Sequence, residues 1–253
     1  MNTLIVPGAF TRASSFDRLA AKLGAGVVEL PLRSRRLPQL DRGGLSAADQ
    51  ALDQAIDRAR AADPGSPLVL VGHSMGGLLA LRASTRHALD GLVLLMPAPP
   101  NGLAADVARM LVRDPRSALT IAALGVTTFP VRAGWLRSVP RGLYAADTSP
   151  EVVAAAARHR ADESLLVLLQ LVLGSRRAVE PTGIPTLVVG GLDDGLVPAP
   201  TVRRLTARLK ADYQEHPVAH NFSEDPAGVV VDDSVCRWLA SRSLAVAGPR
   251  AET

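Results

Sequence analysis

The sequence predicts an α/β protein whose mostly parallel sheet is flanked by helices. Two observations lead to this prediction. Short apolar segments alternate with helix-forming segments up to about residue 98, and this alternation resumes at residue 184. The apolar segments are continuously hydrophobic, which is typical of parallel strands that are buried on both faces. We therefore expect one core domain, formed by residues 1–98 and 184–253, interrupted by a helical insertion at 99–183.

Proline or glycine bounds the expected strands of the first half. These strands are residues 4–6, 27–30, 66–71 and 92–96. Serines indicate where the helices between these strands begin. Ser14 or Ser15 can cap the start of a helix that ends near residue 22, and Ser46 can cap the start of a long amphipathic helix. Good helix formers at 78–84 follow the third strand almost directly. The chain therefore passes from strand to helix there within a very short turn.

Helical candidates replace strands in the insertion, where prolines separate apolar segments. The candidates are residues 107–112, 117–124, 152–160 and 163–173. The core then resumes with expected strands at 184–189 and 213–216, expected helices at 199–210 and 227–241, and a loose tail from about 243. Because the insertion interrupts the strand–helix rhythm, we expect it to lie over the sheet as a cap.

Composition and charge favour a cytoplasmic enzyme over several other classes of protein. The formal net charge is only +4 and the arginines are scattered, which argues against nucleic-acid binding. Cys236 is the single cysteine, so no internal disulfide can form. We expect no signal peptide and no membrane span, since the longest apolar stretch, 165–173, is too short. We also expect no metal or organic cofactor, and we leave monomer and homodimer open.

The sequence Gly-His-Ser-Met-Gly-Gly at 72–77 lies at the short turn between the third strand and its helix. So sharp a turn exposes the hydroxyl of Ser74 above the carboxyl end of the sheet, and glycines on either side let strand and helix approach. A serine hydroxyl is a weak nucleophile at neutral pH and needs a base to take its proton. Histidine suits that role because its ordinary pKa is about 6.5, and a buried carboxylate can orient it.

The order of Ser74, the pair Asp193-Asp194 and His220 on this background resembles the α/β-hydrolase superfamily. Residues 189–198 look like the family's acid loop, and residues 218–222 look like its histidine loop. The resemblance implies a serine nucleophile, a histidine base and an aspartate that orients it. Pro198 favours Asp194 over Asp193 as the acid, because the family places a proline four positions beyond it. Chain order favours His220 over His216 as the base.

The same resemblance implies an oxyanion hole. One donor would be the N–H of Met75, the residue after the nucleophile. The second would be the N–H of Ala9, in the loop that follows the first strand, where Pro7 replaces the family's frequent histidine. We expect Phe10, in that loop, and His73, beside the serine, to bind the substrate.

We therefore expect a serine hydrolase that cleaves a carboxylic ester of a small, apolar substrate through an acyl-enzyme on Ser74. Part of the apolar surface of the insertion's helices would wall an acyl pocket above Ser74; the alternative is that all of this surface packs on the sheet domain. A thioesterase, a lactonase or a lyase of natural-product metabolism could use the same residues. A non-catalytic ligand-binding protein on this fold is the alternative of another class, but such a protein would more often have lost one of the three side chains.

Overall fold

The computed structural model describes residues 1–31, 44–116, 118, 142–159, 163–174 and 180–244. Its centre is a six-stranded sheet with the order β2-β1-β3-β4-β5-β6, in which every neighbouring pair is parallel. The strands are β1 (Asn2–Val6), β2 (Gly26–Val27), β3 (Leu68–His73), β4 (Gly91–Leu95), β5 (Thr186–Gly191) and β6 (Asp212–His216). All residues of β3, β4 and β5 are buried, as their continuous hydrophobicity predicts.

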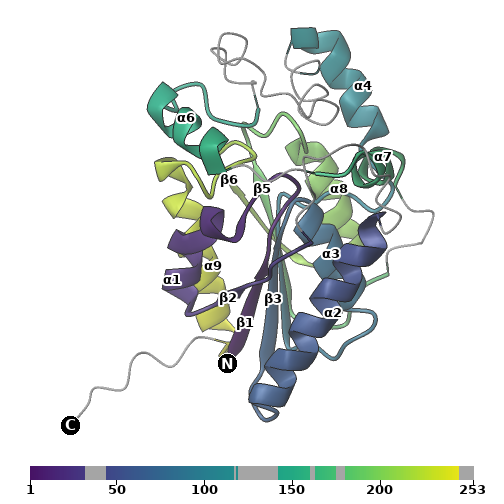
Figure 1. Ribbon diagram of the computed structural model, residues 1–253, viewed down its shortest axis with the longest axis vertical. Coiled ribbons are helices and arrows are strands. Elements are labelled where there is room, and N and C mark those ends of the chain that lie inside the picture. The colour runs from purple at the N-terminus through teal and green to yellow at the C-terminus, as the bar shows by residue number, and fades with distance from the viewer. Residues whose placement is uncertain (32–43, 117, 119–141, 160–162, 175–179, 245–253) are drawn as a thin grey trace.

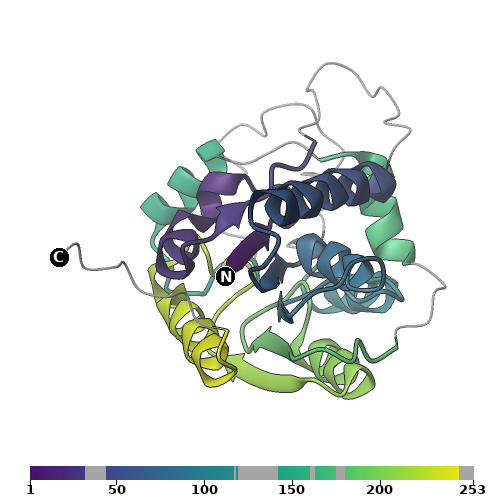
Figure 2. The ribbon, with the colours of Figure 1, turned by 90° about the horizontal axis from the view of Figure 1, so that it is seen from below.

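Helices cover both faces of the sheet (Figures 1 and 2). On one face lie α1 (Asp17–Leu23), which follows the 3-10 helix η1 (Ala13–Phe16), and α9 (Val229–Ser241), which follows η2 (Pro226–Gly228). On the other lie α2 (Gly44–Ala62), α3 (Met75–Ala83) and α8 (Ala199–Leu209). Each face of the sheet has its own hydrophobic core, and successive residues of a strand contribute to opposite cores because side chains alternate along a strand. Val69 packs with side chains of α1 and α9, whereas Leu70 packs with side chains of α2, α3 and α8. The predicted α/β class and its flanking helices are therefore confirmed.

The insertion contributes α4 (Ala104–Arg113), α6 (Pro150–His159) and α7 (Leu165–Leu173). Figure 1 places these helices toward the end of the sheet at which the strands finish. Val167 and Leu171 of α7 belong to the same core as the side chains of α2 and α3, whereas Leu169 and Leu173 are exposed. Part of the apolar surface of this helix thus packs on the core domain. None of the helices in the described ranges is long and apolar enough to cross a membrane.

Several elements differ by a few residues from the expected bounds, and the differences at the second strand and at the long helix have a structural cause. The second strand is limited to Gly26–Val27, because it lies at the sheet edge and pairs only with Leu4 and Ile5 of β1. The long helix begins at Gly44, two residues before Ser46, and the side chain of Gln170 accepts a hydrogen bond from the N–H of Leu45 at 2.7 Å. A side chain that is distant in the sequence therefore accepts a hydrogen bond from an N–H group in the first turn of this helix. Apart from Ala118, the candidate helix at 117–124 lies outside the described residues, as does nearly all of the tail from 243.

Candidate active site

Ser74 occupies a strained turn between β3 and α3. Its φ of 53° and ψ of −118° lie outside the regions that most residues adopt. The turn is possible because glycines on both sides allow close backbone contact. A Cβ on Gly72 would lie 2.4 Å from the carbonyl oxygen of Gly76, and one on Gly76 would lie 2.0 Å from that of Val6. The local sequence thus fixes a sharp strand-to-helix turn of the kind that a nucleophile elbow requires.

A chain of two hydrogen bonds joins the three predicted side chains. Nε2 of His220 lies 2.9 Å from Oγ of Ser74, and Nδ1 of His220 lies 2.7 Å from Oδ2 of Asp194. All three residues are at least nine-tenths buried. A carboxylate can only accept, so Nδ1 carries the proton and Nε2 is left free to accept the serine hydroxyl. This arrangement can move a proton from Ser74 to His220 during an attack.

The carboxylate of Asp194 is itself held in place by the backbone. Its second oxygen, Oδ1, accepts hydrogen bonds from the N–H groups of Leu196 and Val197 at 2.9 and 2.8 Å. The neighbouring Asp193 is exposed. His216 lies in β6, where its Nε2 is buried without a partner in the described part of the chain. Of the residue pairs considered from the sequence, the structure brings Asp194 and His220, rather than Asp193 and His216, to Ser74.

The loop after β1 lies against Ser74. A Cβ on Gly8 would lie 3.0 Å from Cβ of Ser74, so the backbone around Ala9 approaches the serine closely. Within the described ranges, the N–H groups of Ala9 and Met75 donate to no other residue. Both remain available to a ligand oxygen. Phe10 is half-buried and has a φ of 63°, an uncommon conformation for a residue with a side chain.

His73 directly precedes Ser74 and is 1 % exposed. Its ring packs between Phe16, Phe222 and His220, with centroid separations of 5.6, 5.6 and 5.0 Å. Its Nε2 lies 2.9 Å from the carbonyl oxygen of His220, while Nδ1 is buried without a partner among the described residues. Burial, reinforced by repulsion from a charged His220, lowers the pKa of His73 from 6.5 to about 3. The ring therefore stays neutral, and its burial favours a supporting role over direct contact with a substrate.

Sequence reasoning missed a contribution from the insertion. The carbonyl oxygen of Gly142 accepts hydrogen bonds from the N–H groups of Gly195, in the acid loop, and His220, at 3.2 and 3.3 Å. The carbonyl of Leu143 accepts from the N–H of Asn221 at 2.8 Å. These bonds use only backbone atoms and join segments that are far apart in sequence. No side-chain pattern could have revealed them.

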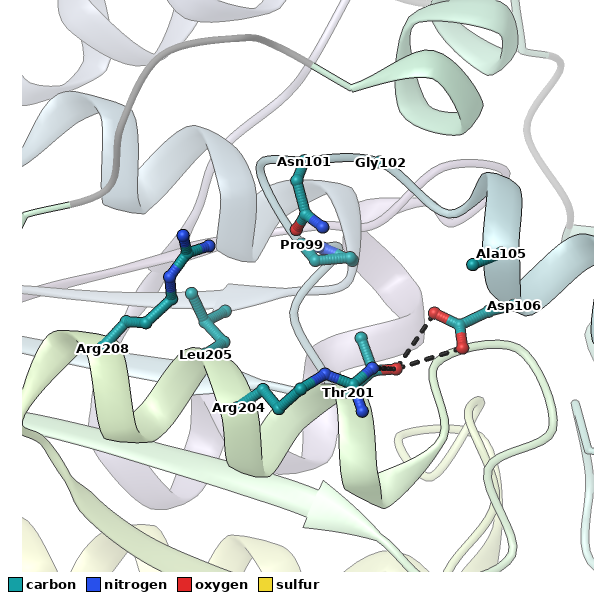
Figure 3. Close-up of a pocket in the computed structure, with 9 residues that line it drawn as sticks. All are labelled: Pro99, Asn101, Gly102, Ala105, Asp106, Thr201, Arg204, Leu205 and Arg208. Atoms are coloured by element: carbon teal, nitrogen blue, oxygen red, sulfur yellow. Dashed lines mark hydrogen bonds between the residues drawn. The ribbon is translucent and has the colours of Figure 1, made fainter.

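A hollow lies at the base of the insertion, between α4 and α8 (Figure 3). It has a volume of about 230 Å³, and none of its lining residues belongs to the Ser74 site. At its rim, the buried carboxylate of Asp106 accepts hydrogen bonds from the hydroxyl of Thr201 and from Arg109. The bond from Thr201 joins the first helix of the insertion to the core, whereas Arg109 lies in the same helix as Asp106. Across the described ranges, no cluster of three or more histidine, cysteine or acidic side chains could hold a metal ion.

Solved structures with a similar fold include several hydrolases. The chain is similar to MenH from S. aureus, with a TM-score of 0.68, 14% identity and coverage of 96% of this chain and 94% of that one. A thermophilic esterase from Thermogutta terrifontis gives a TM-score of 0.68 at 18% identity, covering 96% and 90% of the two chains. The thioesterase RedJ from the prodiginine pathway of Streptomyces coelicolor gives 0.61 at 19% identity, covering 94% and 90%. At these identities the likeness concerns the fold.

No curated protein matches the sequence. The model of the alpha/beta hydrolase family, however, matches residues 3–233, which is most of the chain. This match agrees with the parallel sheet, with the elbow at Ser74 and with the similar solved structures. The protein therefore belongs to the α/β-hydrolase family.

Proposed function

We propose that the protein is a serine hydrolase that cleaves a carboxylic ester of a small, apolar substrate through an acyl-enzyme on Ser74. The observation that carries this proposal is the hydrogen-bonded chain from Ser74 through His220 to Asp194. The chain supplies a nucleophile, a base and a group that orients the base, in the geometry that acyl transfer requires.

In the first half of the reaction, Oγ of Ser74 attacks the ester carbonyl while Nε2 of His220 takes the hydroxyl proton. The carbonyl oxygen becomes an oxyanion, which the N–H groups of Ala9 and Met75 stabilise. The ester C–O bond then breaks, and the imidazolium of His220 gives its proton to the departing alkoxide. Throughout this step Asp194 holds Nδ1–H and stabilises the charged ring.

In the second half, a water molecule attacks the acyl-enzyme. His220 takes one proton from the water, and a second oxyanion forms between the same two N–H groups. The bond from the acyl carbon to Oγ then breaks, and His220 returns the proton to Ser74. The carboxylic acid leaves, and the three side chains are restored to their initial protonation states.

Substitution of the nucleophile tests this function. Ser74→Ala should lower the hydrolysis of p-nitrophenyl esters by several orders of magnitude, because loss of a triad nucleophile costs about 10⁶-fold in a well-studied case. A fluorophosphonate should add once to the wild type, at Ser74, with loss of fluoride, and should not add to the variant. Ser84→Ala is the matched control, because Ser84 caps the other end of α3 and, among the described residues, its hydroxyl donates to the carbonyl of Leu81 in the same helix. Full esterase activity in Ser74→Ala would refute the proposal.

Substrate class is tested with a panel of graded acyl chains, offered as both oxygen esters and thioesters. If apolar residues of the insertion line the acyl site, kcat/KM should rise from acetyl to medium-length chains. Each buried methylene contributes up to about 0.8 kcal/mol, which is nearly fourfold per carbon. Acyl groups with a charge should be poor substrates, since a buried charge requires a partner. A flat or falling profile would show that the insertion does not line the acyl site.

A further inference from the structure

The position of His220 depends on its backbone as well as on its ring. A ring that is hydrogen-bonded at both nitrogens transfers a proton efficiently only if its backbone keeps it aligned, and a misplacement of about 1 Å can cost roughly a hundredfold in rate. His220 lies in a loop beyond β6, outside any helix or strand. Its main chain therefore needs hydrogen bonds from elsewhere in the molecule.

Two groups outside the hydrogen-bonded chain provide these bonds. The carbonyl oxygen of His220 lies 2.9 Å from Nε2 of His73. A carbonyl can only accept, so Nε2 of His73 carries the hydrogen and donates it. The N–H of His220 donates to the carbonyl of Gly142 at 3.3 Å. Both main-chain polar groups of His220 are therefore engaged, one by the nucleophile elbow and one by the insertion.

The surroundings of His73 and Gly142 hold each of these two residues in a fixed position. His73 is enclosed by Phe16, Phe222 and the ring of His220, so it has little freedom to rotate. Gly142 has a φ of 91°, and a Cβ on it would lie 2.3 Å from Cα of Gly195. Only a glycine allows that approach, through which the same carbonyl also accepts from the N–H of Gly195 in the acid loop.

We propose that His73 and Gly142 are positioning residues that hold the main chain of His220, so that its ring stays aligned between Asp194 and Ser74. This inference rests on the proposed function. His73 acts from the elbow, which also carries the nucleophile. Gly142 acts from the insertion and links the acid loop to the histidine loop through one carbonyl oxygen. The insertion is thus part of the support of the active site.

Paired variants test the two positions. His73→Leu removes the N–H donor, whereas His73→Gln can present an amide N–H near the same point. Gly142→Ala introduces the contact with Gly195, whereas Gly183→Ala is a matched control with a φ of 71° and nothing within 4 Å of the added carbon. We expect His73→Leu and Gly142→Ala to lose roughly ten- to a hundredfold in kcat with smaller changes in KM, and both controls to stay within about threefold of the wild type.

A second readout does not depend on turnover. The proton on Nδ1 of His220, which is bonded to Asp194, should give a downfield NMR signal in the wild type and in both controls. The signal should weaken or shift in His73→Leu and Gly142→Ala. If the wild type shows no Ser74-dependent hydrolysis, the proposed function fails, but this signal still tests the positioning.

Three results would overturn the proposal. One is that His73→Leu and Gly142→Ala keep both the wild-type kcat and the downfield signal. Another is that His73→Gln loses as much as His73→Leu, since ring packing rather than the donor would then be responsible. The last is that Gly142→Ala and Gly183→Ala lose activity equally. If His73→Leu fails to fold, the comparison of Gly142→Ala with Gly183→Ala, in kcat and in the downfield signal, tests the proposal.

Discussion

Two adjacent aspartates in the acid loop have different environments. Asp194 is 5 % exposed and binds the ring of His220, whereas Asp193 is exposed to solvent. The resemblance to the α/β-hydrolase family favoured Asp194 through the position of Pro198, four residues further along the chain. The sequence could not reveal the hydrogen bonds from Leu196 and Val197 that fix the carboxylate.

The difference between these aspartates leads to a prediction. Asp194→Asn should lower kcat by about ten-thousandfold, because an amide cannot hold the correct tautomer of the histidine. Asp193→Asn makes the same chemical change one residue earlier and should leave kcat nearly unchanged. Steady-state kinetics on a p-nitrophenyl ester measure both. A larger loss in the Asp193 variant would assign the acid to the other carboxylate.

His73 should also affect the response of stability to acid. The unfolded chain binds a proton at this residue near pH 6.5, whereas the folded protein resists protonation until about pH 3. Between these values the unfolded state holds more protons, so the free energy of unfolding falls as the pH falls, by at most about 1.4 kcal/mol per pH unit from this site. Above pH 6.5 the site adds no pH dependence.

Urea unfolding between pH 7 and pH 4 measures this effect. The free energy of unfolding of His73→Gln should fall less steeply with decreasing pH than that of the wild type, because glutamine has no titrating group. Parallel curves for the two proteins would contradict the low pKa of His73.

At the scale of the elements, α3 and β1 lie unusually close to one another. The contact depends on Gly76, where a Cβ would lie 2.0 Å from the carbonyl oxygen of Val6. The sequence predicted this part of the fold well, because strand, turn and helix follow one another within a few residues. It predicted the start of α2 less well, since the N–H of Leu45 is satisfied by Gln170, which is 125 residues away.

Gly76→Ala should therefore destabilise the protein. Overpacking of a tight contact costs about 1–3 kcal/mol, and here the added carbon meets backbone atoms of Val6 and Pro7, which cannot rotate away as a side chain could. Gly65→Ala is the control, because nothing lies within 4 Å of the added carbon in that turn. Chemical denaturation of the two variants compares their free energies of unfolding. Equal stability would mean that α3 can move away from β1 at little cost.

At the scale of the whole molecule, the insertion is attached to the core at several points. Thr201 of α8 donates to the buried carboxylate of Asp106 in α4 (Figure 3), and Gly142 binds the acid and histidine loops. The sequence predicted that the insertion is helical, because its apolar periodicity is local. It could not predict these attachments, which join residues that are distant in the chain.

Removal of one hydroxyl tests the attachment at Asp106. Thr201→Val should lower the free energy of unfolding by about 1–3 kcal/mol, because it takes a hydrogen bond from a buried carboxylate. Thr206→Val is the control, since Thr206 is also buried in α8 but its hydroxyl bonds to the carbonyl of Val202 in the same helix. Thermal and urea unfolding measure both variants. A smaller loss for Thr201→Val than for Thr206→Val would show that the attachment contributes little.

The uniform direction of the strands has a practical consequence. Because every strand of the sheet is parallel to its neighbours, Ser74 and the loops with Asp194 and His220 follow the carboxyl ends of their strands. Met1 precedes β1 and lies at the opposite end of the sheet, as Figure 1 shows. A tether attached at the amino terminus would therefore fix the protein to a bead or an electrode with the Ser74 end of the sheet directed away from the support.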